Sequence, residues 1–402
     1  MSLPLEGLRV LDLTRALAGP YCAMILADLG ADVVKVEPTP KGEMTRAWGP
    51  FDHGTSAYYL SINRNKRSVA LSFREPRAVE LLRDLALQAD VLIENFKPGT
   101  MEGMGLDAET LMAANPRLIY ANITGFGRDG PYGDWPGVDQ IAQGMSGFMS
   151  ITGTESSGPI RVGLPIGDVC AGMWAAIGVQ AAVVQRQQSG RGQRVETSLL
   201  AGLVGMLNIQ GQRWLSVADA PARIGNDHPV ICPYGTFQAS DGPFNMAAAT
   251  DDMWRKLCTL VGREDLARHP DFADNTVRMK NREVVKAALN ERFAARPRLE
   301  WVNALVKLGL PAGPIYDMAE VFDDPQVRHC GMVETVTHPH IGELRLLSNP
   351  LRLDAMAGRS VRTPPPLLGE HSTAALEDWG IDPARVGELV AAGVVMQAEE
   401  NA

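Results

Sequence analysis

An acidic residue in front of a long apolar run is the first candidate for chemistry in this sequence. Asp168 lies in GLPIGDVCAGMWAAIGVQAAVV, where the apolar pattern after it predicts a helix. Aspartate is a favoured helix N-cap, because its side-chain oxygen accepts hydrogen bonds from the free N–H groups of the first turn. The same N–H groups and the positive helix end would keep the carboxylate ionised, and Gly167, Ala171 and Gly172 leave room for another molecule. Asp168 can therefore be a cap, a nucleophile that attacks an acyl carbon, or both.

Two further acids allow similar alternatives. Glu94 ends the run ADVLIEN, and a glutamate at the end of a buried strand usually makes a local hydrogen bond or salt bridge. Asp139 follows a loop and opens a helical pattern in GDWPGVDQIAQGMSG. It is therefore either a second helix cap or a second acid of the site.

Three other kinds of site fit the sequence less well. The first strand-to-helix turn, TRALAGPYC, lacks the GxGxxG pattern of dinucleotide-binding sites, although Glu37 ends the second predicted strand. Ser146 lies in GMSGF, where Phe148 replaces the last glycine of the GxSxG pattern of hydrolases. His338 and His340 lack a nearby third ligand at metal spacing, so we expect no metal site.

The elements that would position these acids alternate along the first part of the chain. Short β-branched runs predict strands with helical patterns between several of them. The predicted strands are residues 8–13, 31–37, 67–73, 89–95 and 117–125. Such alternation predicts a parallel sheet with crossover helices, and ligands outside the carboxyl ends of the strands.

A change of composition predicts a second domain. Residues 220–250 have the density of Pro, Gly and Asp that is typical of loops and hairpins, and helical patterns follow them. The C-terminal part returns to short strands. We therefore place a large α/β domain at residues 1–215, a linker and a smaller α+β domain at 216–325, and a return to the large domain at 326–402.

Composition also limits the class of protein. The 402-residue chain has a net charge of −9 and no dense Lys/Arg block, which argues against a nucleic-acid partner. Its five cysteines form no CxxC pair and fit a reducing compartment. The N-terminal residues lack a signal-peptide pattern, and the apolar stretch 169–184 falls short of the roughly 20 residues that cross a bilayer. We expect a soluble, cytoplasmic protein without a membrane partner.

Several motifs, in one order along nearly the whole chain, resemble the class III CoA-transferases, the family of formyl-CoA:oxalate and carnitine CoA-transferases. These motifs are PLEGLRVLDLTRALAGPYCAMILADLGADVVKVE, NRNKRSVAL, ADVLIENFKPG, NPRLIYANITGFG, GDVCAGMWAAIG, GLPAGPI and PPPLLGEH. The resemblance implies a Rossmann-like large domain with a parallel sheet, a smaller domain inserted in it, and an interlocked homodimer. It implies an acyl-CoA and a free carboxylic acid as substrates, with no permanently bound cofactor.

The resemblance also implies a mechanism. The family's nucleophilic aspartate falls on Asp168, whose carboxylate would attack an acyl-CoA to give an aspartyl mixed anhydride. The released CoA thiolate would then form an aspartyl-CoA thioester, and the acceptor acid would take over the CoA in mirror-image steps. Asp139 matches a family glutamate near the reacting groups.

The binding residues implied by the resemblance cluster near the carboxyl ends of the predicted strands. Positions that match the family's CoA-binding residues are Leu17, Ala18, Leu71, Arg74, Asn95 and Phe96. Arg15 and Arg74 are candidates to meet the CoA phosphates. Trp48 and Tyr58 match positions of the acid pocket in the oxalate enzyme.

Some positions depart from the family's pattern. Leu17 stands where the oxalate enzyme has glutamine, Pro38 and Gly103 replace CoA-contacting arginines, and no run of consecutive glycines precedes Phe237. These departures argue against oxalate or formate as the substrate, and a small dicarboxylate such as succinate is suggested only at the level of the family.

Two alternatives to a CoA-transferase remain open. The same fold serves α-methylacyl-CoA racemases. In these enzymes a histidine stands just before the aspartate that corresponds to Asp139, and it pairs with the aspartate that corresponds to Asp168 to exchange an α-proton. Here that stretch reads Gly137, Val138, Asp139, and valine carries no exchangeable proton. The other alternative, an acyl-CoA-binding protein without catalysis, would not require an intact Asp168.

Overall fold

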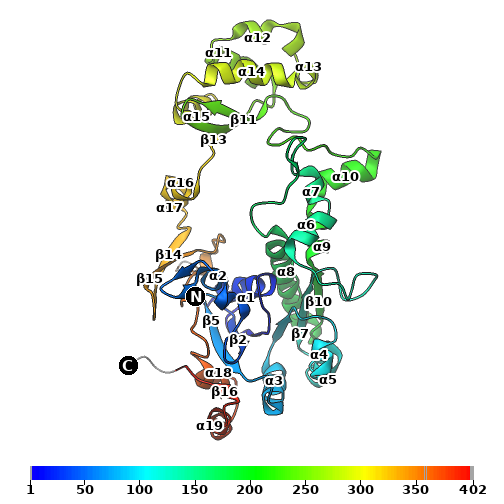
Figure 1. The fold of residues 1–402 in the computed structure, drawn as a ribbon, viewed down its shortest axis with the longest axis vertical. Helices are drawn as coiled ribbons and strands as arrows, with labels where there is room; N and C mark the ends of the chain where they lie inside the picture. Colours follow the sequence, from blue (N-terminus) through cyan, green and yellow to red (C-terminus); the bar gives the residue numbers. More distant parts are fainter. Residues whose placement is uncertain (1, 357, 359, 399–402) are drawn as a thin grey trace. The chain divides into compact units, whose positions relative to one another are not determined.

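The computed structural model describes residues 2–356, 358 and 360–398. The chain divides into two compact units (Figure 1). The large unit comprises Met1–Met149, Arg161–Ala220 and Arg328–Ala402, and the small unit comprises Ser150–Ile160 and Pro221–Val327.

These boundaries differ from the predicted domains mainly at Ser150–Ile160, which the sequence analysis placed in the large domain. This segment contains the two-residue strands β8 (Gly153–Thr154) and β9 (Gly158–Pro159). The N–H of Gly225 donates to the carbonyl of Gly153 over 2.8 Å, and Arg223 donates to the carbonyls of Ser150 and Thr154. The segment therefore joins the small unit through partners far along the chain, which composition does not reveal.

A seven-stranded sheet forms the centre of the large unit, in the order β10-β7-β6-β1-β2-β5-β16. Its strands are β1 (Arg9–Asp12), β2 (Asp32–Pro38), β5 (Lys66–Leu71), β6 (Val91–Glu94), β7 (Ile119–Thr124), β10 (Arg194–Ser198) and β16 (Val395–Met396). All pairs are parallel except β16 with β5. The predicted parallel sheet is confirmed, and every predicted strand of the first part of the chain is present.

The strand order reverses at β1. From β1 the chain adds β2 and β5 on one side, and then β6, β7 and β10 on the other. In sheets of this kind, ligands bind in the crevice outside the carboxyl ends of the strands where the order reverses. The turns after β1 and β6 flank that crevice.

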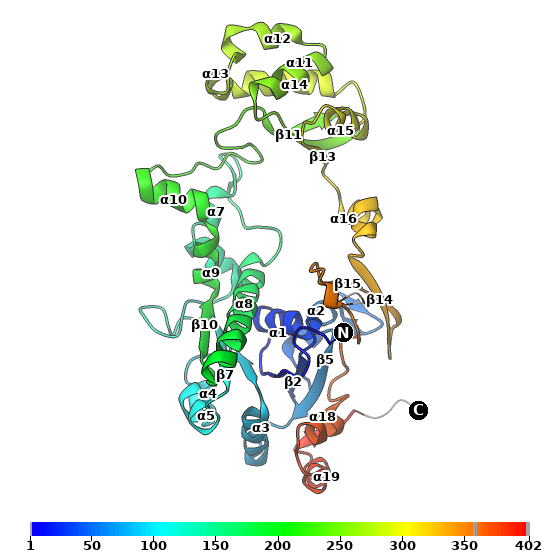
Figure 2. The same ribbon diagram turned by 180° about the vertical axis from the view of Figure 1, so that it is seen from behind.

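Alternating side chains of the strands fill two cores, one on each face of the sheet. On one face, Val10, Val33 and Ile93 pack with α1 (Ala18–Asp28) and α8 (Ile166–Ser189). These two helices lie side by side in both views (Figures 1 and 2). On the other face, buried strand residues pack against α3 (Pro76–Gln88), α5 (Ala108–Ala114), α18 (Ser372–Asp378) and α19 (Pro383–Ala391).

Shorter elements complete the large unit. They are η1 (Met44–Ala47), β3 (Phe51–Asp52), β4 (Thr55–Ser56), α2 (Ala57–Ile62), α4 (Thr100–Gly103), α6 (Asp139–Met145), α9 (Leu199–Met206), α10 (Asn208–Val217), β14 (Val333–His338), β15 (Gly342–Leu347) and η3 (Asp354–Met356). Two short helices, α7 (Phe148–Ile151) and α17 (Pro325–His329), span two of the four points where the chain passes between units.

The small unit is an α+β structure. Its antiparallel sheet consists of β11 (Tyr234–Ala239), β12 (Gly242–Ala247) and β13 (Ala312–Pro314). Its helices are α11 (Asp251–Leu260), α12 (Glu264–Arg268), η2 (Pro270–Phe272), α13 (Asn275–Lys280), α14 (Arg282–Phe293), α15 (Arg298–Lys307) and α16 (Met318–Asp323). Phe237, Phe244, Phe293 and Trp301 pack in its core with ring centroids 5.0 to 6.3 Å apart.

The length of α8 differs from the sequence-based expectation. It has 24 residues, and among the described residues it is the one helix that is long and apolar enough to cross a membrane by length and composition. The interpretation that its apolar stretch is too short was therefore wrong. One face of α8 packs against α1 and the sheet, as in the core helix of a folded domain, while Met173, Trp174 and Ile177 are exposed on it.

Candidate active site

Asp168 is not the N-cap of α8. The N-cap position belongs to Pro165, the helix begins at Ile166, and Asp168 lies within the first turn. Its carboxylate makes no side-chain cap hydrogen bond, so the cap interpretation was wrong. The helix begins earlier than the apolar pattern indicates, because a side chain from another element binds its first turn.

Asp139 is that side chain. It is the first residue of α6, and Val138 in front of it makes no side-chain cap. The Oδ1 atom of Asp139 accepts a 2.7 Å hydrogen bond from the N–H of Gly167, and its Oδ2 accepts a 2.7 Å bond from Nε2 of Gln143. Asp139 therefore caps α8 and not its own helix.

The carboxyl group of Asp168 titrates well above the usual range. Burial raises its pKa to about 7, and the negative charge of Asp139 acts in the same direction. The expectation that the helix end keeps the Asp168 carboxylate ionised was wrong, because loss of hydration and a like charge outweigh the field of the helix terminus. A carboxyl with such a perturbed pKa in a cavity is a candidate for catalysis.

Asp168 opens into a cavity of about 660 Å³ in the large unit. Trp48 and Tyr58 also line it, with their rings edge to face and centroids 5.2 Å apart. Burial raises the pKa of Tyr58, and the charge of Asp168 raises it further. The predicted site residues that line this cavity are Arg15, Leu17, Ala18, Trp48, Tyr58, Asn95, Phe96, Asp139 and Asp168.

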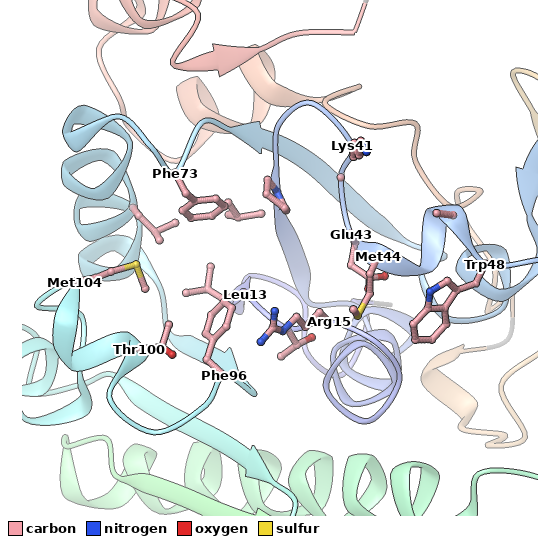
Figure 3. Close-up of a pocket in the computed structure, with 16 residues that line it drawn as sticks. Leu13, Arg15, Lys41, Glu43, Met44, Trp48, Phe73, Phe96, Thr100 and Met104 are labelled. Atoms are coloured by element: carbon pink, nitrogen blue, oxygen red, sulfur yellow. The ribbon is translucent and has the colours of Figure 1, made fainter. Parts of the chain in front are cut away.

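A second cavity of about 620 Å³ shares Arg15, Met44, Trp48 and Phe96 with the first. Figure 3 shows Phe73 and Met104 around its apolar end, with Arg15 and Trp48 on the side shared with the first cavity. Lys41 and Glu43 supply charged groups to its wall. The two cavities therefore adjoin each other through these shared residues, outside the carboxyl ends of the strands.

The turns after β1 and β6 are bonded to each other. The N–H of Arg15 donates to Oδ1 of Asn95 over 3.0 Å, and Nδ2 of Asn95 donates to the carbonyl of Arg15 over 2.8 Å. The Arg15 guanidinium lies 5.2 Å from the ring centroid of Phe96. This pairing fixes an exposed cation at the crevice where the strand order reverses.

Two buried lysines donate hydrogen bonds to backbone carbonyls on either side of the turn after β1. Nζ of Lys35 donates to the carbonyl of Thr14 over 2.8 Å. Nζ of Lys66 donates to the carbonyl of Pro20 over 2.9 Å and to Oδ2 of Asp12 over 3.0 Å. Burial lowers the pKa of Lys66 to about 8. Both ends of the turn that carries Leu17 and Ala18 are thus held by charged donors.

Two predicted CoA-binding residues are not part of this lining. Leu71 is buried in the core at the end of β5. Arg74 is exposed in the turn that follows, and no described residue forms an ion pair with it. Their neighbour Phe73 lines the second cavity instead. The role of Leu71 and Arg74 in CoA binding stays a prediction.

The other acids and histidines have local partners. Glu94 accepts a hydrogen bond from the N–H of Phe96 over 2.8 Å and another from Asn122, which is the local role expected for a strand-end glutamate. Glu37 is buried and bound by both Nε and Nη2 of Arg46. Within the described residues, no group of three or more His, Cys, Asp or Glu is placed to hold a metal ion.

The sequence analysis missed several residues of the site. Lys97 and Arg161 line the first cavity, and Glu43 lines the second while accepting a 2.9 Å bond from the N–H of Ala16. Lys97 follows Asn95 and Phe96 in ENFKPG, so the motif itself could have identified it. Arg161 lies in a loop without periodicity, and no sequence signal places it near Asp168.

Comparisons with known proteins agree with this geometry. The model of CoA-transferase family III matches residues 5–372. Human succinyl-CoA:glutarate CoA-transferase is 37% identical over 400 residues, covering 99% of this chain and 91% of that protein. The acetyl-CoA:oxalate CoA-transferase of Acetobacter aceti is 36% identical over 95% of this chain and 97% of its own length.

Two further relatives complete the comparison. The succinyl-CoA:mesaconate CoA-transferase of Haloarcula marismortui is 38% identical over 94% of this chain and 97% of its own length. The crystal structure of a CAIB/BAIF family protein from Brucella suis superposes with a TM-score of 0.86 at 40% identity, covering 94% of this chain and 100% of that one.

Fold and site together define an α/β enzyme whose cavity holds a carboxylate with a raised pKa where the strand order reverses. The chain belongs to CoA-transferase family III. It is a CoA-transferase, and that prediction from the sequence is confirmed.

Proposed function

We propose that the protein moves CoA from an acyl-CoA to a free carboxylic acid through covalent intermediates on Asp168. The observation that carries the proposal is the state of this carboxyl group. It lines a 660 Å³ cavity, its pKa is raised to about 7, and no described residue donates a hydrogen bond to it. An unpaired, partly desolvated carboxylate is a better nucleophile than a solvated one, because it has less hydration to lose.

The first half of the reaction exchanges the acyl group for CoA. An Oδ atom of Asp168 attacks the thioester carbonyl carbon, the C–S bond breaks, and CoA leaves as a thiolate from an aspartyl mixed anhydride. The thiolate then attacks Cγ of Asp168, and the bond from Cγ to the bridging oxygen breaks. The donor's acid leaves as a carboxylate and the enzyme retains an aspartyl-CoA thioester.

The second half reverses these steps with the acceptor acid. The acceptor carboxylate attacks Cγ and expels the CoA thiolate, which then attacks the acceptor's acyl carbon in the new anhydride. Cleavage on the acyl side of the bridge releases acyl-CoA and restores the Asp168 carboxylate. No water, metal or net proton transfer is needed for the balance, so the energy of the thioester is retained. Asp139 takes part by holding the first turn of α8 around Asp168.

We place CoA along the two adjoining cavities. The apolar wall with Phe73, Phe96 and Met104 suits the nonpolar surfaces of the cofactor. Arg15, Lys41 and Lys97 supply positive charge for its phosphates. Arg74 remains a further candidate, and in its exposed turn it is free to reach a phosphate.

The acceptor is proposed to be a small dicarboxylic acid. Glutarate, oxalate and mesaconate, which appear in the names of the relatives, all carry two carboxyl groups. The departures of Leu17, Pro38 and Gly103 from the oxalate enzyme argue against oxalate as the acceptor.

We also propose that the protein is an interlocked homodimer in the cytoplasm. Apolar side chains are exposed along three successive helices of the large unit: Met173, Trp174 and Ile177 on α8, Val204 and Met206 on α9, and Ile209, Trp214, Leu215 and Val217 on α10. A surface of this kind favours burial against a second copy. Light scattering is expected to give twice the mass of one chain.

Buried Cys22, Cys170, Cys232 and Cys258 form no disulfide, which suits a reducing compartment such as the cytoplasm.

An oxygen label tests the covalent mechanism. Panels of acyl-CoAs and carboxylic acids, analysed by mass spectrometry, first identify a working donor and acceptor. With that acceptor labelled by ¹⁸O in its carboxylate, one oxygen is expected to remain on Asp168 after a single turnover, because the anhydride breaks on the acyl side. Transfer of CoA without label on Asp168 would rule out the anhydride route. The Asp168→Asn variant, which cannot form the anhydride, is the control.

A deuterium experiment separates transfer from racemisation. A chiral 2-methylacyl-CoA in deuterated water is expected to gain no α-deuterium above an enzyme-free control, because Val138 offers no second proton-carrying group. Rapid uptake with inversion, and no transfer to any acid, would contradict the proposed function.

A further inference from the structure

Arg161 is a cation of the Asp168 cavity that has no acid partner among the residues that the structure describes. It lines the same cavity as Asp168 and Asp139, and its side chain is exposed. Its one hydrogen bond joins Nη1 to the carbonyl of the next residue, Val162, at 3.4 Å. No carboxylate of the described residues forms an ion pair with it. A guanidinium that faces a cavity without a counter-charge is available to an anionic ligand.

The backbone beside Arg161 is held in place by the same network that holds α8. The N–H of Val162 donates to Oε1 of Gln143 over 2.9 Å, and Nε2 of Gln143 donates to Oδ2 of Asp139 over 2.7 Å. Gln143 is fully buried. Because Asp139 also binds Gly167, two hydrogen bonds of one aspartate tie the base of Arg161 to the residue before Asp168. The backbone at the base of Arg161 is therefore held in place, while its side chain is exposed.

The other two cations of the cavity have a different origin. Arg15 and Lys97 lie on the turns after β1 and β6, and Arg15 is paired through its backbone with Asn95 and stacked on Phe96. These turns form the part of the lining proposed above for CoA. Arg161 comes from the segment that leads into α8, so it is the cation of this cavity that does not belong to the lining proposed for CoA.

We infer that Arg161 binds the second, unreacting carboxylate of a dicarboxylic acid and thereby sets the preference for dicarboxylic over monocarboxylic acids. This inference rests on the proposed function, because it assigns the specificity of that same site. Arg161 would make the same contact with the distal carboxylate of a dicarboxylic acyl-CoA donor, since donor and acceptor acyl groups react in turn on Asp168.

Charge explains why such a cation is needed. Asp134, Asp139 and Asp168 already bring three acidic groups into the cavity, and a dicarboxylic acid adds two more negative charges. A carboxylate without a partner in a partly desolvated site is costly, whereas a guanidinium can bind both of its oxygens at once. A monocarboxylic acid leaves Arg161 hydrated, because the side chain is exposed, and therefore gains nothing from it. The long side chain on a fixed base also allows acids of different lengths.

A pair of acids matched in length tests the inference. Glutarate and pentanoate have the same number of carbons and differ by one distal carboxylate. With one acyl-CoA donor held constant, kcat/KM is measured for both acids in the wild type and in Arg161→Gln. We expect the glutarate-to-pentanoate ratio to fall at least tenfold, through a higher KM for glutarate, with the pentanoate value nearly unchanged. Arg161→Lys is expected to recover part of the ratio, because it restores the charge but not the bidentate geometry.

The control is Arg83→Gln, which removes the same charge from an exposed position on α3 outside both cavities. It should leave the ratio unchanged, so a general effect of net charge is separated from binding. An unchanged ratio in Arg161→Gln, or an equal loss with both acids, overturns the inference. A wild type that transfers CoA to pentanoate as well as to glutarate also overturns it, yet leaves the proposed function standing. A wild type that transfers CoA to no acid in the panels overturns the proposed function, and the inference with it.

Discussion

Oδ1 of Asp139 accepts a 2.7 Å hydrogen bond from the N–H of Gly167, the residue immediately before Asp168. These two acids, which line the same cavity, are therefore coupled through one backbone group. Asp139 has donors on both oxygens, from Gly167 and Gln143, whereas Asp168 has none among the described residues. The paired acid can hold the helix and the unpaired acid can react, so similar side chains have different roles because of their partners.

The first prediction concerns the pH dependence of the wild type. In the proposed mechanism, attack requires the ionised form of Asp168, whose pKa burial and Asp139 raise to about 7. We expect kcat/KM for the acyl-CoA to increase about tenfold per pH unit below that value and to level off above it. The measurement is a series of initial rates from pH 5 to 9 in buffers of constant ionic strength. A flat profile down to pH 5 would mean that the carboxyl ionises in its ordinary range.

The second prediction separates the two causes of that shift. Asp139→Asn removes the like charge but leaves Asp168 buried, so the midpoint of the pH profile should move to lower pH without reaching the ordinary range of aspartate. The side-chain oxygen of asparagine can still accept the hydrogen bond from the N–H of Gly167. Its NH₂ group then faces Nε2 of Gln143, which is also a donor, so that hydrogen bond is lost. We therefore expect a loss of about 1 kcal/mol in the free energy of unfolding as well.

Asp139→Ala is the comparison for this second prediction. It removes the charge and also the cap on Gly167, which typically costs about 1 kcal/mol. A midpoint that stays at the wild-type value in both variants would show that the charge of Asp139 does not reach Asp168.

The sequence analysis predicted the elements well and their long-range partners poorly. The β-branched runs around Val10, Val33 and Val91 are local signals, and they correctly predicted parallel strands and a site at their carboxyl ends. The start of α8 was missed because its cap, Asp139, lies 28 residues before Gly167 along the chain. Local propensity contains no information on such a partner.

The candidate site shows the same limit. Leu17, Ala18, Asn95 and Phe96, which the family resemblance suggested, line the first cavity at the carboxyl ends of the strands, where the pattern of strands predicts a ligand. Arg161 lies in an irregular loop whose position depends on Gln143, which is a tertiary contact. The raised pKa of Asp168 was also unpredictable from the sequence, because it depends on burial.

The third prediction concerns the stability of Asp168→Asn, which should also lack turnover. The folded state holds the Asp168 proton up to about pH 7, while the unfolded chain releases it near 3.8. Deprotonation therefore favours the unfolded wild type as pH rises from about 4 to 7, and the neutral variant avoids this loss. The variant should be more stable than the wild type by on the order of 2 kcal/mol at pH 8, and by about a quarter of that at pH 4.5. Thermal unfolding at the two pH values measures the difference in stability between variant and wild type. An equal difference at both pH values would contradict the raised pKa of Asp168 as its cause.

The last prediction concerns the close approach of α1 and α8 behind the cavity. A Cβ atom on Gly172 would lie 2.6 Å from the carbonyl oxygen of Ala18 and 3.2 Å from the ring of Tyr21. Because Ala18 lines the cavity, Gly172→Ala should displace the start of α1, cost about 1 to 3 kcal/mol of stability and weaken acyl-CoA binding. Gly387→Ala on α19 is the matched control, since nothing lies within 4 Å of its added Cβ, and it should stabilise by roughly 0.5 to 1 kcal/mol. Unfolding midpoints and calorimetric titration with a non-transferable acyl-CoA analogue measure both effects. Normal acyl-CoA affinity in a destabilised Gly172→Ala variant would show that this helix contact supports the fold and not the site.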